Sequence, residues 1–173
     1  MTQTRWVKYR GWEHSLIKER CETVFYVDAS YSFDSTIGEI LDVSNQVFGS
    51  NTGFAQASVN APVAISKESF EPDSKRNTNA SLAWLRTQPD YQEGMEIIHE
   101  TKYICYDPQS ENFQKLSNFF WERYSMEMDS FIDEPLWAYT LHHFNVDPAP
   151  MKNSMFGHDV TRSQVHAEMV NPI

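Results

Sequence analysis

A short run of β-branched and aromatic residues near the start of the chain stands between two stretches with helical spacing. The run lies in CETVFYVDAS (residues 21–30), where VFYV is followed by an aspartate and small residues. This composition predicts a strand. Residues 5–20 before it and residues 37–47 after it repeat apolar side chains at helical spacing. The order helix, strand, helix predicts an α/β protein.

Local signals refine the two flanking helices. The apolar positions of the first helix are Trp6, Val7, Trp12, Leu16 and Ile17. Gly11 marks an interruption or a start within this segment. The tripeptide Asp34-Ser35-Thr36 offers N-cap side chains for the second helix. The apolar positions of that helix are Ile37, Ile40, Leu41 and Val47.

The rest of the chain alternates between loop-forming and periodic segments. Residues 49–79 are rich in Gly, Ser, Asn and Pro, which predicts a long loop with one short strand at 62–66. The other predicted elements are a helix over 81–88, one bent or two short strands over 95–106, and helices over 110–128 and 132–144. We therefore expect one α/β domain, residues 1–146, with a small mixed sheet flanked by helices. An irregular C-terminal arm, residues 147–173, is expected to follow it.

Length and charge limit the classes of function. A chain of 173 residues suits one domain with a real core. Its net charge of -10 argues against nonspecific binding to nucleic acid, whose phosphates would be repelled. No apolar run approaches the ~20 residues needed to cross a bilayer. The basic N-terminus also lacks the apolar centre of a signal peptide, so we expect a cytoplasmic protein with Cys21 and Cys105 reduced.

The aspartate that ends the predicted strand is the first candidate site residue. A strand that ends in Asp28, with Ser30 beside it, carries oxygen ligands to the edge of the sheet, where α/β proteins bind ligands. Such oxygens suit Mg²⁺ or Mn²⁺ held against a diphosphate. The alternative is that Asp28 simply opens a turn.

The acidic pair Asp133-Glu134 is the second candidate, at the start of the predicted helix over 132–144. A capping aspartate is ordinary at a helix N-terminus, and Pro135 suits the first turn. Capping explains Asp133 but leaves Glu134 without a role. We expect an enzyme site if the acidic pair and Asp28 face the same part of the molecule.

Neither the histidines nor the common catalytic motifs point to a particular activity. His99 lies in a strand-like run, whereas His142 and His143 are adjacent on a helix and point to different faces, which makes them a poor metal site. The sequence contains no GxSxG, P-loop, GxGxxG or HExxH motif. These absences remove the commonest hydrolases, NTPases and dinucleotide enzymes.

Four stretches together have the order of motifs found in a known enzyme family. They are FYVDAS (25–30), QPDYQEGMEIIHET (88–101), NFFWERY (118–124) and IDEPLWAYTL (132–141). In this order the chain resembles GT-A-type glycosyltransferases, and more closely the glycosyltransferase-like proteins of plant cell-wall and bacterial or viral glycan pathways. The resemblance spans about residues 20–145. It implies a GT-A-like fold in shortened form, without most of the N-terminal nucleotide-binding half.

The resemblance also implies roles for particular residues. Asp28 would hold Mn²⁺ or Mg²⁺ against the diphosphate of a nucleotide-sugar donor. Asp133 and Glu134 would be catalytic, acting on the sugar or on the attacking hydroxyl of a glycan acceptor. The residues expected to bind substrate are Ser30, His99 and Trp121.

The sequence differs from the family pattern at two positions, and other functions stay open. The metal motif contains Asp-Ala-Ser and no second carboxylate, and Ile132 stands where the family has an arginine. The alternative function is a noncatalytic α/β protein that binds a partner or assembles into a homo-oligomer through the C-terminal arm. A metal-dependent hydrolase or nuclease using Asp28, Asp133, Glu134 and a histidine is a third option, which the net charge disfavours for nucleic-acid substrates.

Overall fold

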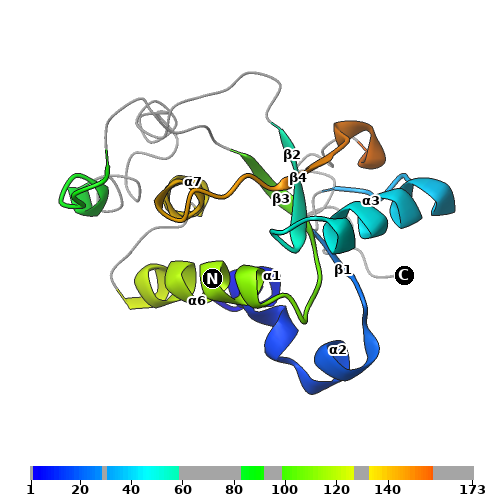
Figure 1. The fold of residues 1–173 in the computed structure, drawn as a ribbon, viewed down its shortest axis with the longest axis horizontal. Helices are drawn as coiled ribbons and strands as arrows, with labels where there is room; N and C mark the ends of the chain where they lie inside the picture. The colour runs from blue at the N-terminus through cyan, green and yellow to red at the C-terminus, as the bar shows by residue number, and fades with distance from the viewer. Residues whose placement is uncertain (1, 29–30, 59–82, 92–98, 127–132, 158–173) are drawn as a thin grey trace, which may run out of the picture.

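The structure is a computed structural model that describes residues 2–28, 31–58, 83–91, 99–126 and 133–157. A mixed four-stranded sheet lies at its centre, in the order β1-β3-β2-β4, with helices on both faces (Figure 1). The strands are β1 (Val24–Val27), β2 (Phe54–Ser58), β3 (His99–Tyr106) and β4 (Ala149–Met151). β3 is antiparallel to β1 and to β2, whereas β4 is parallel to β2. The predicted α/β class and small mixed sheet are confirmed.

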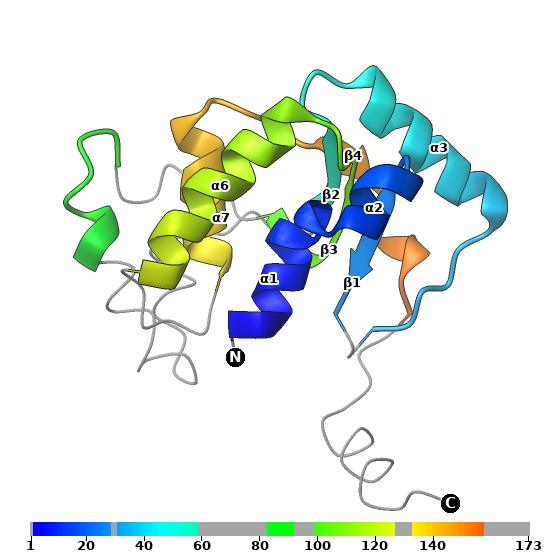
Figure 2. The same ribbon diagram turned by 90° about the horizontal axis from the view of Figure 1, so that it is seen from below.

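Three helices cover one face of the sheet (Figure 2). They are α1 (Thr2–Arg10), α6 (Glu111–Met126) and α7 (Glu134–His143). The core beneath them is largely aromatic: the Tyr106 and Phe113 rings stack at 4.3 Å, and the Tyr9 ring lies 4.9 Å from that of Trp137. Large rings bury much apolar area per residue, which suits a short chain with a small sheet.

The helix α3 (Ile37–Gly49) covers the opposite face. Its buried residues Val43 and Val47 contact the small side chains of Ala55 and Ala57 in β2 within one apolar cluster. Small residues on the strand let the helix approach the sheet closely. The 3₁₀ helix η3 (Asn153–Met155) completes this layer, and the chain just after it brings Phe156 to stack on Tyr103 at 3.7 Å.

The N-terminal helical segment is interrupted near Gly11, as predicted. After α1 come the 3₁₀ helix η1 (Gly11–Glu13) and the short helix α2 (Ser15–Arg20). A Cβ atom at Gly11 would lie 3.0 Å from the Tyr106 hydroxyl, so the close approach of η1 to β3 favours glycine.

The buried face of α1 differs from the predicted one. Val7, expected in the core, is 51% exposed, whereas Lys8 and Tyr9 are almost completely buried. Leu16 of α2 is also exposed. Of the five apolar positions predicted for this segment, Trp12 is buried as expected. The prediction was wrong for Val7 and Leu16, and it left out Lys8 and Tyr9.

Most of the other predicted elements are confirmed. The Thr36 hydroxyl caps α3 by accepting from the Glu39 N–H, and the Glu39 carboxylate accepts from the Thr36 N–H. The predictions for β1, α3, α6 and α7 agree with the structure to within a few residues, and β3 is the described part of the predicted strands. A helical turn at 83–85 falls within the helix expected over 81–88.

Three elements lie where irregular chain was expected. β2 lies inside the predicted loop over 49–79, so that prediction is wrong for residues 54–58. β4 and η3 lie in the first part of the segment expected to be an arm, and Met151 and Met155 are core residues. The strand expected at 62–66 and the rest of the arm beyond residue 157 lie outside the described residues.

Cys21 and Cys105 are both free thiols. Burial raises the pKa of the Cys105 thiol far above its usual value, which favours the neutral form. Among the described residues, no helix combines the length and the apolar character that crossing a membrane requires.

Candidate functional site

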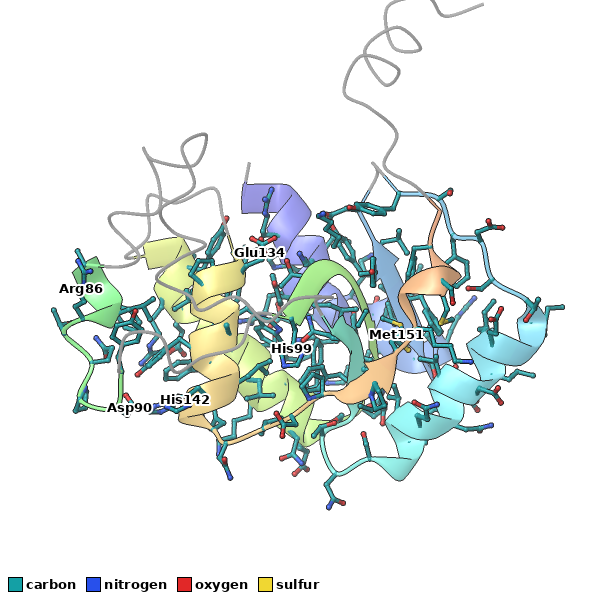
Figure 3. All side chains as sticks on the ribbon, turned by 90° about the horizontal axis from the view of Figure 1, so that it is seen from above. Arg86, Asp90, His99, Glu134, His142 and Met151 are labelled. Carbon is teal, nitrogen blue, oxygen red and sulfur yellow. The ribbon has the colours of Figure 1, made fainter. Side chains whose placement is uncertain are left out.

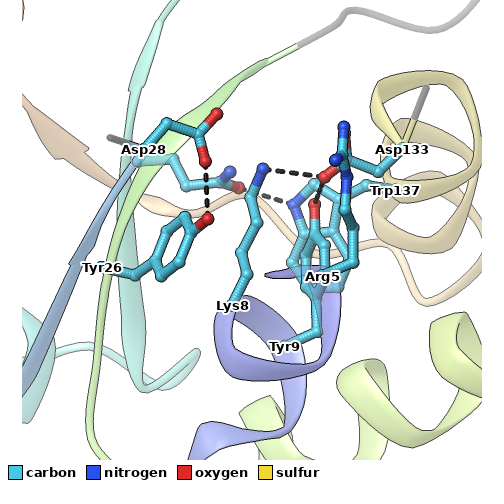
Figure 4. A network of polar contacts seen from close by, with 8 residues as sticks. Arg5, Lys8, Tyr9, Tyr26, Asp28, Asp133 and Trp137 are labelled. Carbon is cyan, nitrogen blue, oxygen red and sulfur yellow. Dashed lines mark hydrogen bonds and ion pairs between the residues drawn. The ribbon is translucent and has the colours of Figure 1, made fainter. Parts of the chain in front are cut away.

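Side chains from α1, β1, α6 and α7 meet beside the face of the sheet that these helices cover. We call this group the Asp133 cluster, and Figure 4 shows most of it. Its members are Arg5, Lys8, Tyr9, Tyr26, Asp28, Tyr124, Asp133 and Glu134. The cluster combines three carboxyl groups, two cations and three phenols. Asp28 and the acidic pair, which are far apart in the sequence, both belong to it.

Asp133 is the most deeply buried carboxylate of the cluster, with 2% of its side chain exposed. Its Oδ2 accepts from the Lys8 ammonium at 2.7 Å and from the Tyr9 hydroxyl at 2.9 Å. The Arg5 guanidinium lies 4.0 Å from its Oδ1. Burial alone would raise the pKa of Asp133, but the Lys8 ammonium, helped by Arg5 and the Tyr9 hydrogen bond, holds it below the usual value. Asp133 is therefore an ionised, internally paired group.

The position of Asp133 also explains how α7 starts. It occupies the N-cap position, as predicted, and its carbonyl accepts from the Trp137 N–H at 2.9 Å. Its side chain makes no capping hydrogen bond, so the predicted capping role is wrong. The carboxylate bonds instead to Lys8 and Tyr9 of α1, and the Trp137 indole donates to Gln56 of β2 at 2.8 Å. These contacts fix the start of α7 against α1 and the sheet.

Glu134 follows Asp133 and is only partly buried (Figure 3). Burial, together with the adjacent Asp133 carboxylate, raises the pKa of Glu134 to about 7. The Lys8 ammonium opposes this rise but is already paired with Asp133. Glu134 is thus a carboxyl group that can take up or release a proton near neutral pH, which suits a general acid or base.

Asp28 follows β1 directly and opens a turn, as one of the two predictions for it had it. Its carbonyl accepts from the Tyr31 N–H at 2.9 Å, which makes a turn, and its N–H donates to Lys102 of β3. Its carboxylate points to the cluster and accepts from the Tyr26 hydroxyl at 2.6 Å (Figure 4). Burial and this hydrogen bond raise the pKa of Tyr26 well above its usual value, so the phenol remains a donor.

Tyr124 of α6 completes the cluster on the side of that helix. Burial raises its pKa to about 12; the Arg5 charge opposes the rise and the Asp133 carboxylate adds to it. All three phenols, Tyr9, Tyr26 and Tyr124, are therefore neutral at physiological pH. They supply hydroxyl groups next to the carboxylates and cations without adding charge.

The remaining predicted site residues are not gathered in the cluster. His99 begins β3 (Figure 3). Burial lowers its pKa and the Asp147 charge partly opposes this, so the neutral imidazole is favoured at pH 7. Its Nδ1 is buried and has no hydrogen-bond partner within the described part of the chain. Trp121 lies one turn before Tyr124 on α6, with ring centroids 6.2 Å apart, at the margin of the cluster. Ser30 lies outside the described residues.

The groups around Asp28 fit a divalent metal ion poorly. The nearest buried carboxylate, Asp133, is already paired with Lys8, whose ammonium lies between the two aspartates in Figure 4. A divalent ion there would be repelled by that ammonium. In the described ranges no three His, Cys, Asp or Glu residues are grouped so that they could hold a metal ion. The cluster thus has a fixed lysine charge in the region where the resemblance implies a metal.

The two adjacent histidines of α7 do not act together, in agreement with the sequence interpretation. His143 pairs through Nδ1 with Asp90 Oδ2 at 2.5 Å, and the Tyr139 hydroxyl donates to the other oxygen of Asp90 at 2.6 Å. Desolvation opposes ionisation of Asp90, but the hydrogen bonds from Tyr139 and His143 together outweigh it and hold the pKa of Asp90 below its usual value. The pair fastens the segment 83–91 onto α7.

Sequence reasoning missed the α1 and tyrosine members of the cluster. A signal for them existed: Arg5, Lys8, Tyr9 and Trp12 follow the i, i+3, i+4, i+7 spacing of one helix face. Tyr9 and Trp12 mark that face as buried, so the two cations on it require a carboxylate partner in the fold. The identity of that partner, 125 positions away from Lys8, could not be read from local sequence.

Comparisons of the chain with family models, with curated proteins and with solved structures gave no match.

Proposed function

We propose that the chain is a glycosyltransferase-like protein that transfers a sugar from a nucleotide-sugar donor to a glycan acceptor. The observation that carries this proposal is the convergence of Asp28 with Asp133 and Glu134 in one cluster. Their motifs are the two acidic motifs on which the resemblance to GT-A-type glycosyltransferases depends. A common site for the two motifs is what the proposed function requires.

Glu134 is the proposed catalytic base. Transfer to an acceptor requires that the attacking hydroxyl lose its proton, and a carboxylate with a pKa near the working pH is the most effective acceptor of that proton. Glu134 has a pKa of about 7 and is only partly buried. Asp133 is fully paired with Lys8 and Tyr9, so its proposed role is to position Glu134 and to raise the pKa of that group.

Asp28 and Arg5 are the proposed donor-binding groups. Both are partly exposed at the cluster. The Arg5 charge suits the diphosphate, whereas the Asp28 carboxylate would repel phosphates and is assigned the hydroxyl groups of the donor, from which it can accept hydrogen bonds. The proposal assigns no step to a metal ion, because the described residues around Asp28 fit one poorly. Since the resemblance implies Mn²⁺ or Mg²⁺, donor binding is measured with and without these ions.

The test is a titration of UDP- and GDP-sugars, followed by thermal shift and by release of nucleoside diphosphate. Asp28→Asn is expected to weaken donor binding, whereas Glu134→Gln keeps binding and loses transfer. Asp42→Asn, an exposed carboxylate on α3, is the matched control and should behave as the wild type. If no donor raises the melting temperature under either metal condition, the proposal fails.

A second candidate function is a noncatalytic α/β protein that binds a partner. The observation that favours it is the internal pairing of the cluster, because Asp133 bonds to Lys8 and Tyr9, and Asp28 bonds to Tyr26. A fully paired buried network can serve to fix a fold rather than to do chemistry. Under this function Asp28→Asn and Glu134→Gln would change the free energy of unfolding, and the wild-type protein would bind no nucleotide-sugar donor.

A further inference from the structure

Tyr124 of α6 differs from the other two phenols of the Asp133 cluster in the state of its hydroxyl group. The Tyr9 hydroxyl donates to Asp133 at 2.9 Å, and the Tyr26 hydroxyl donates to Asp28 at 2.6 Å. The Tyr124 hydroxyl makes no hydrogen bond within the described part of the chain, although the residue is only 6% exposed. Polar groups at such depth normally have a partner, so a donor and an acceptor are left available here.

The Tyr124 hydroxyl lies beside the groups to which the chemistry is assigned. It is close enough to the Arg5 guanidinium and to the Asp133 and Glu134 carboxylates for their charges to affect the pKa of the phenol. α6 packs against α1, which carries Arg5, and against α7, which begins at Glu134. Figure 2 shows these three helices on the same face of the sheet. Tyr124 is therefore a neighbour of the proposed base.

The charges around Tyr124 restrict what can bind to it. An anionic group bonded to its hydroxyl would be repelled by the Asp133 and Glu134 carboxylates, and an ammonium group would be repelled by Arg5. The net charge of -10 also opposes the approach of an acidic glycan. A neutral hydroxyl group fits, because it can both donate to the Tyr124 hydroxyl and accept from it.

A second side chain of α6 extends this site. Trp121, one turn before Tyr124, is partly exposed, and its ring lies 6.2 Å from that of Tyr124. A sugar carries hydroxyl groups around its rim and C–H groups on its faces. The flat indole suits the face of such a ring, and the phenol hydroxyl suits its rim.

We propose that Tyr124 binds the acceptor, and that the acceptor is a neutral sugar with a hydroxyl group bonded to the Tyr124 hydroxyl. The inference rests on the proposed transferase function, because it assigns this sugar to the substrate that Glu134 deprotonates. Tyr124 and Trp121 hold the ring so that a neighbouring hydroxyl of the same sugar reaches Glu134. The oxygen of that hydroxyl bonds to the donor sugar as the bond to the diphosphate breaks. Its proton passes to Glu134, and the nucleoside diphosphate leaves.

The first test is the stability of the free protein. Tyr124→Phe removes a hydroxyl without a partner in the described structure, so its melting temperature should match that of the wild type. Tyr9→Phe removes a hydroxyl that is bonded to the buried Asp133 carboxylate, and should melt several degrees lower. If Tyr124→Phe is destabilised as much as Tyr9→Phe, the Tyr124 hydroxyl has a partner within the protein and the proposal is wrong.

The second test is sugar binding by the full chain without any nucleotide. Saturation-transfer difference NMR is recorded with the methyl glycosides of glucose, galactose and mannose. The wild type should bind at least one of them, and Tyr124→Phe should bind it about three- to tenfold more weakly, the effect of one neutral hydrogen bond. Tyr106→Phe is the matched control. It also removes a buried hydroxyl without a partner among the described residues, beneath η1, and should bind as the wild type does.

The outcomes separate this inference from the proposed function. If nucleotide-sugar donors bind but no neutral glycoside does, or if Tyr124→Phe binds the glycoside as tightly as the wild type, the acceptor site is wrong and the transferase proposal stands. If a glycoside binds through Tyr124 and no donor binds, the sugar site is upheld and the transferase proposal fails. Tighter binding of glucuronic acid or glucosamine, which carry charges, would contradict a neutral acceptor.

Discussion

The Lys8 ammonium and the Asp133 carboxylate form an ion pair of 2.7 Å in which each side chain is 2% exposed. The pair joins the first helix of the chain to the start of α7. A buried pair is sensitive to the loss of one partner, because the remaining charge stays in a site that water does not reach.

Lys8→Met is therefore expected to destabilise the protein by about 3–5 kcal/mol, the usual result of leaving one buried charge alone. Adding Asp133→Asn removes that charge while keeping an acceptor for the Tyr9 hydroxyl, and should recover a large part of the loss. Urea denaturation gives the free energies of unfolding of the two single variants and the double variant. If the two single losses in free energy of unfolding add up to the loss of the double variant, Lys8 and Asp133 do not interact in solution.

The raised pKa of Glu134 predicts how stability depends on pH. The group titrates at about 7 in the folded protein and near 4.5 when unfolded, so the folded state binds the proton more tightly. Stability should therefore fall as pH rises from 4.5 to 7 and change no further above 7. Asp133 has a lowered pKa, so its contribution is present above 3.8 and is lost only at lower pH.

Glu134→Gln should remove this dependence. The variant is expected to match the wild type at pH 4.5 and to exceed it by roughly 3 kcal/mol at pH 8, since each pKa unit is worth about 1.36 kcal/mol. Denaturant unfolding at several pH values measures the difference. Glu122→Gln, on a side chain that is 67% exposed, is the control and should follow the wild type at every pH. If the free energy of unfolding changes with pH in the same way for Glu134→Gln and the wild type, the raised pKa of Glu134 is contradicted.

Gly11 in η1 and Gly49 at the end of α3 should respond differently to substitution by alanine. A Cβ at Gly11 would lie 3.0 Å from the Tyr106 hydroxyl, so Gly11→Ala requires η1 or the Tyr106 side chain to shift by a few tenths of an ångström and should cost about 1–3 kcal/mol. No atom lies within 4 Å of the corresponding position at Gly49, the last residue of α3. Gly49→Ala should be neutral, or stabilise by up to about 1 kcal/mol through helix propensity. Thermal melts compare the two, and a matching loss at both sites would contradict the close contact at Gly11.

The capping box of α3 gives a further local prediction. Thr36→Ala removes the hydroxyl that accepts from the Glu39 N–H and should cost about 1 kcal/mol. Thr36→Ser keeps that acceptor and should lose little. If the alanine and serine variants unfold at the same denaturant concentration, the hydroxyl does not cap the helix in solution.

Elements with strong local signals were predictable from the sequence. α3 has both halves of a capping box, α6 has aromatic residues at helical spacing, and β1 is an uninterrupted run of β-branched and aromatic residues. β2 and β4 have no such signal. β2 reads FAQAS, with alanines at the two positions that are fully buried under α3, and β4 contains Pro150, which an edge strand tolerates. Both are strands because of the neighbours that pair with them.

The site was predictable only in part, for the same reason. Asp28 and the acidic pair stand out because each ends or begins a clear element. Lys8 does not stand out in the sequence, since a lysine on an N-terminal helix is usually exposed. Its burial depends on Asp133, and Asp133 could be assigned a capping role as long as only its sequence neighbours were considered. Contacts between residues more than a hundred positions apart carry no local signal.

The pairing of β2 with β4 has a consequence for synthesis of the chain. Ala55 in β2 pairs with Ala149 in β4, and Val24 in β1 pairs with Tyr106 in β3, so the sheet contains few local contacts. Sheets built from such distant pairings fold slowly, because long loops have to close before the strands pair. On the ribosome, most of the chain would have to emerge before the sheet could close, and until then the edge of β2 that pairs with β4 would be open to other strands.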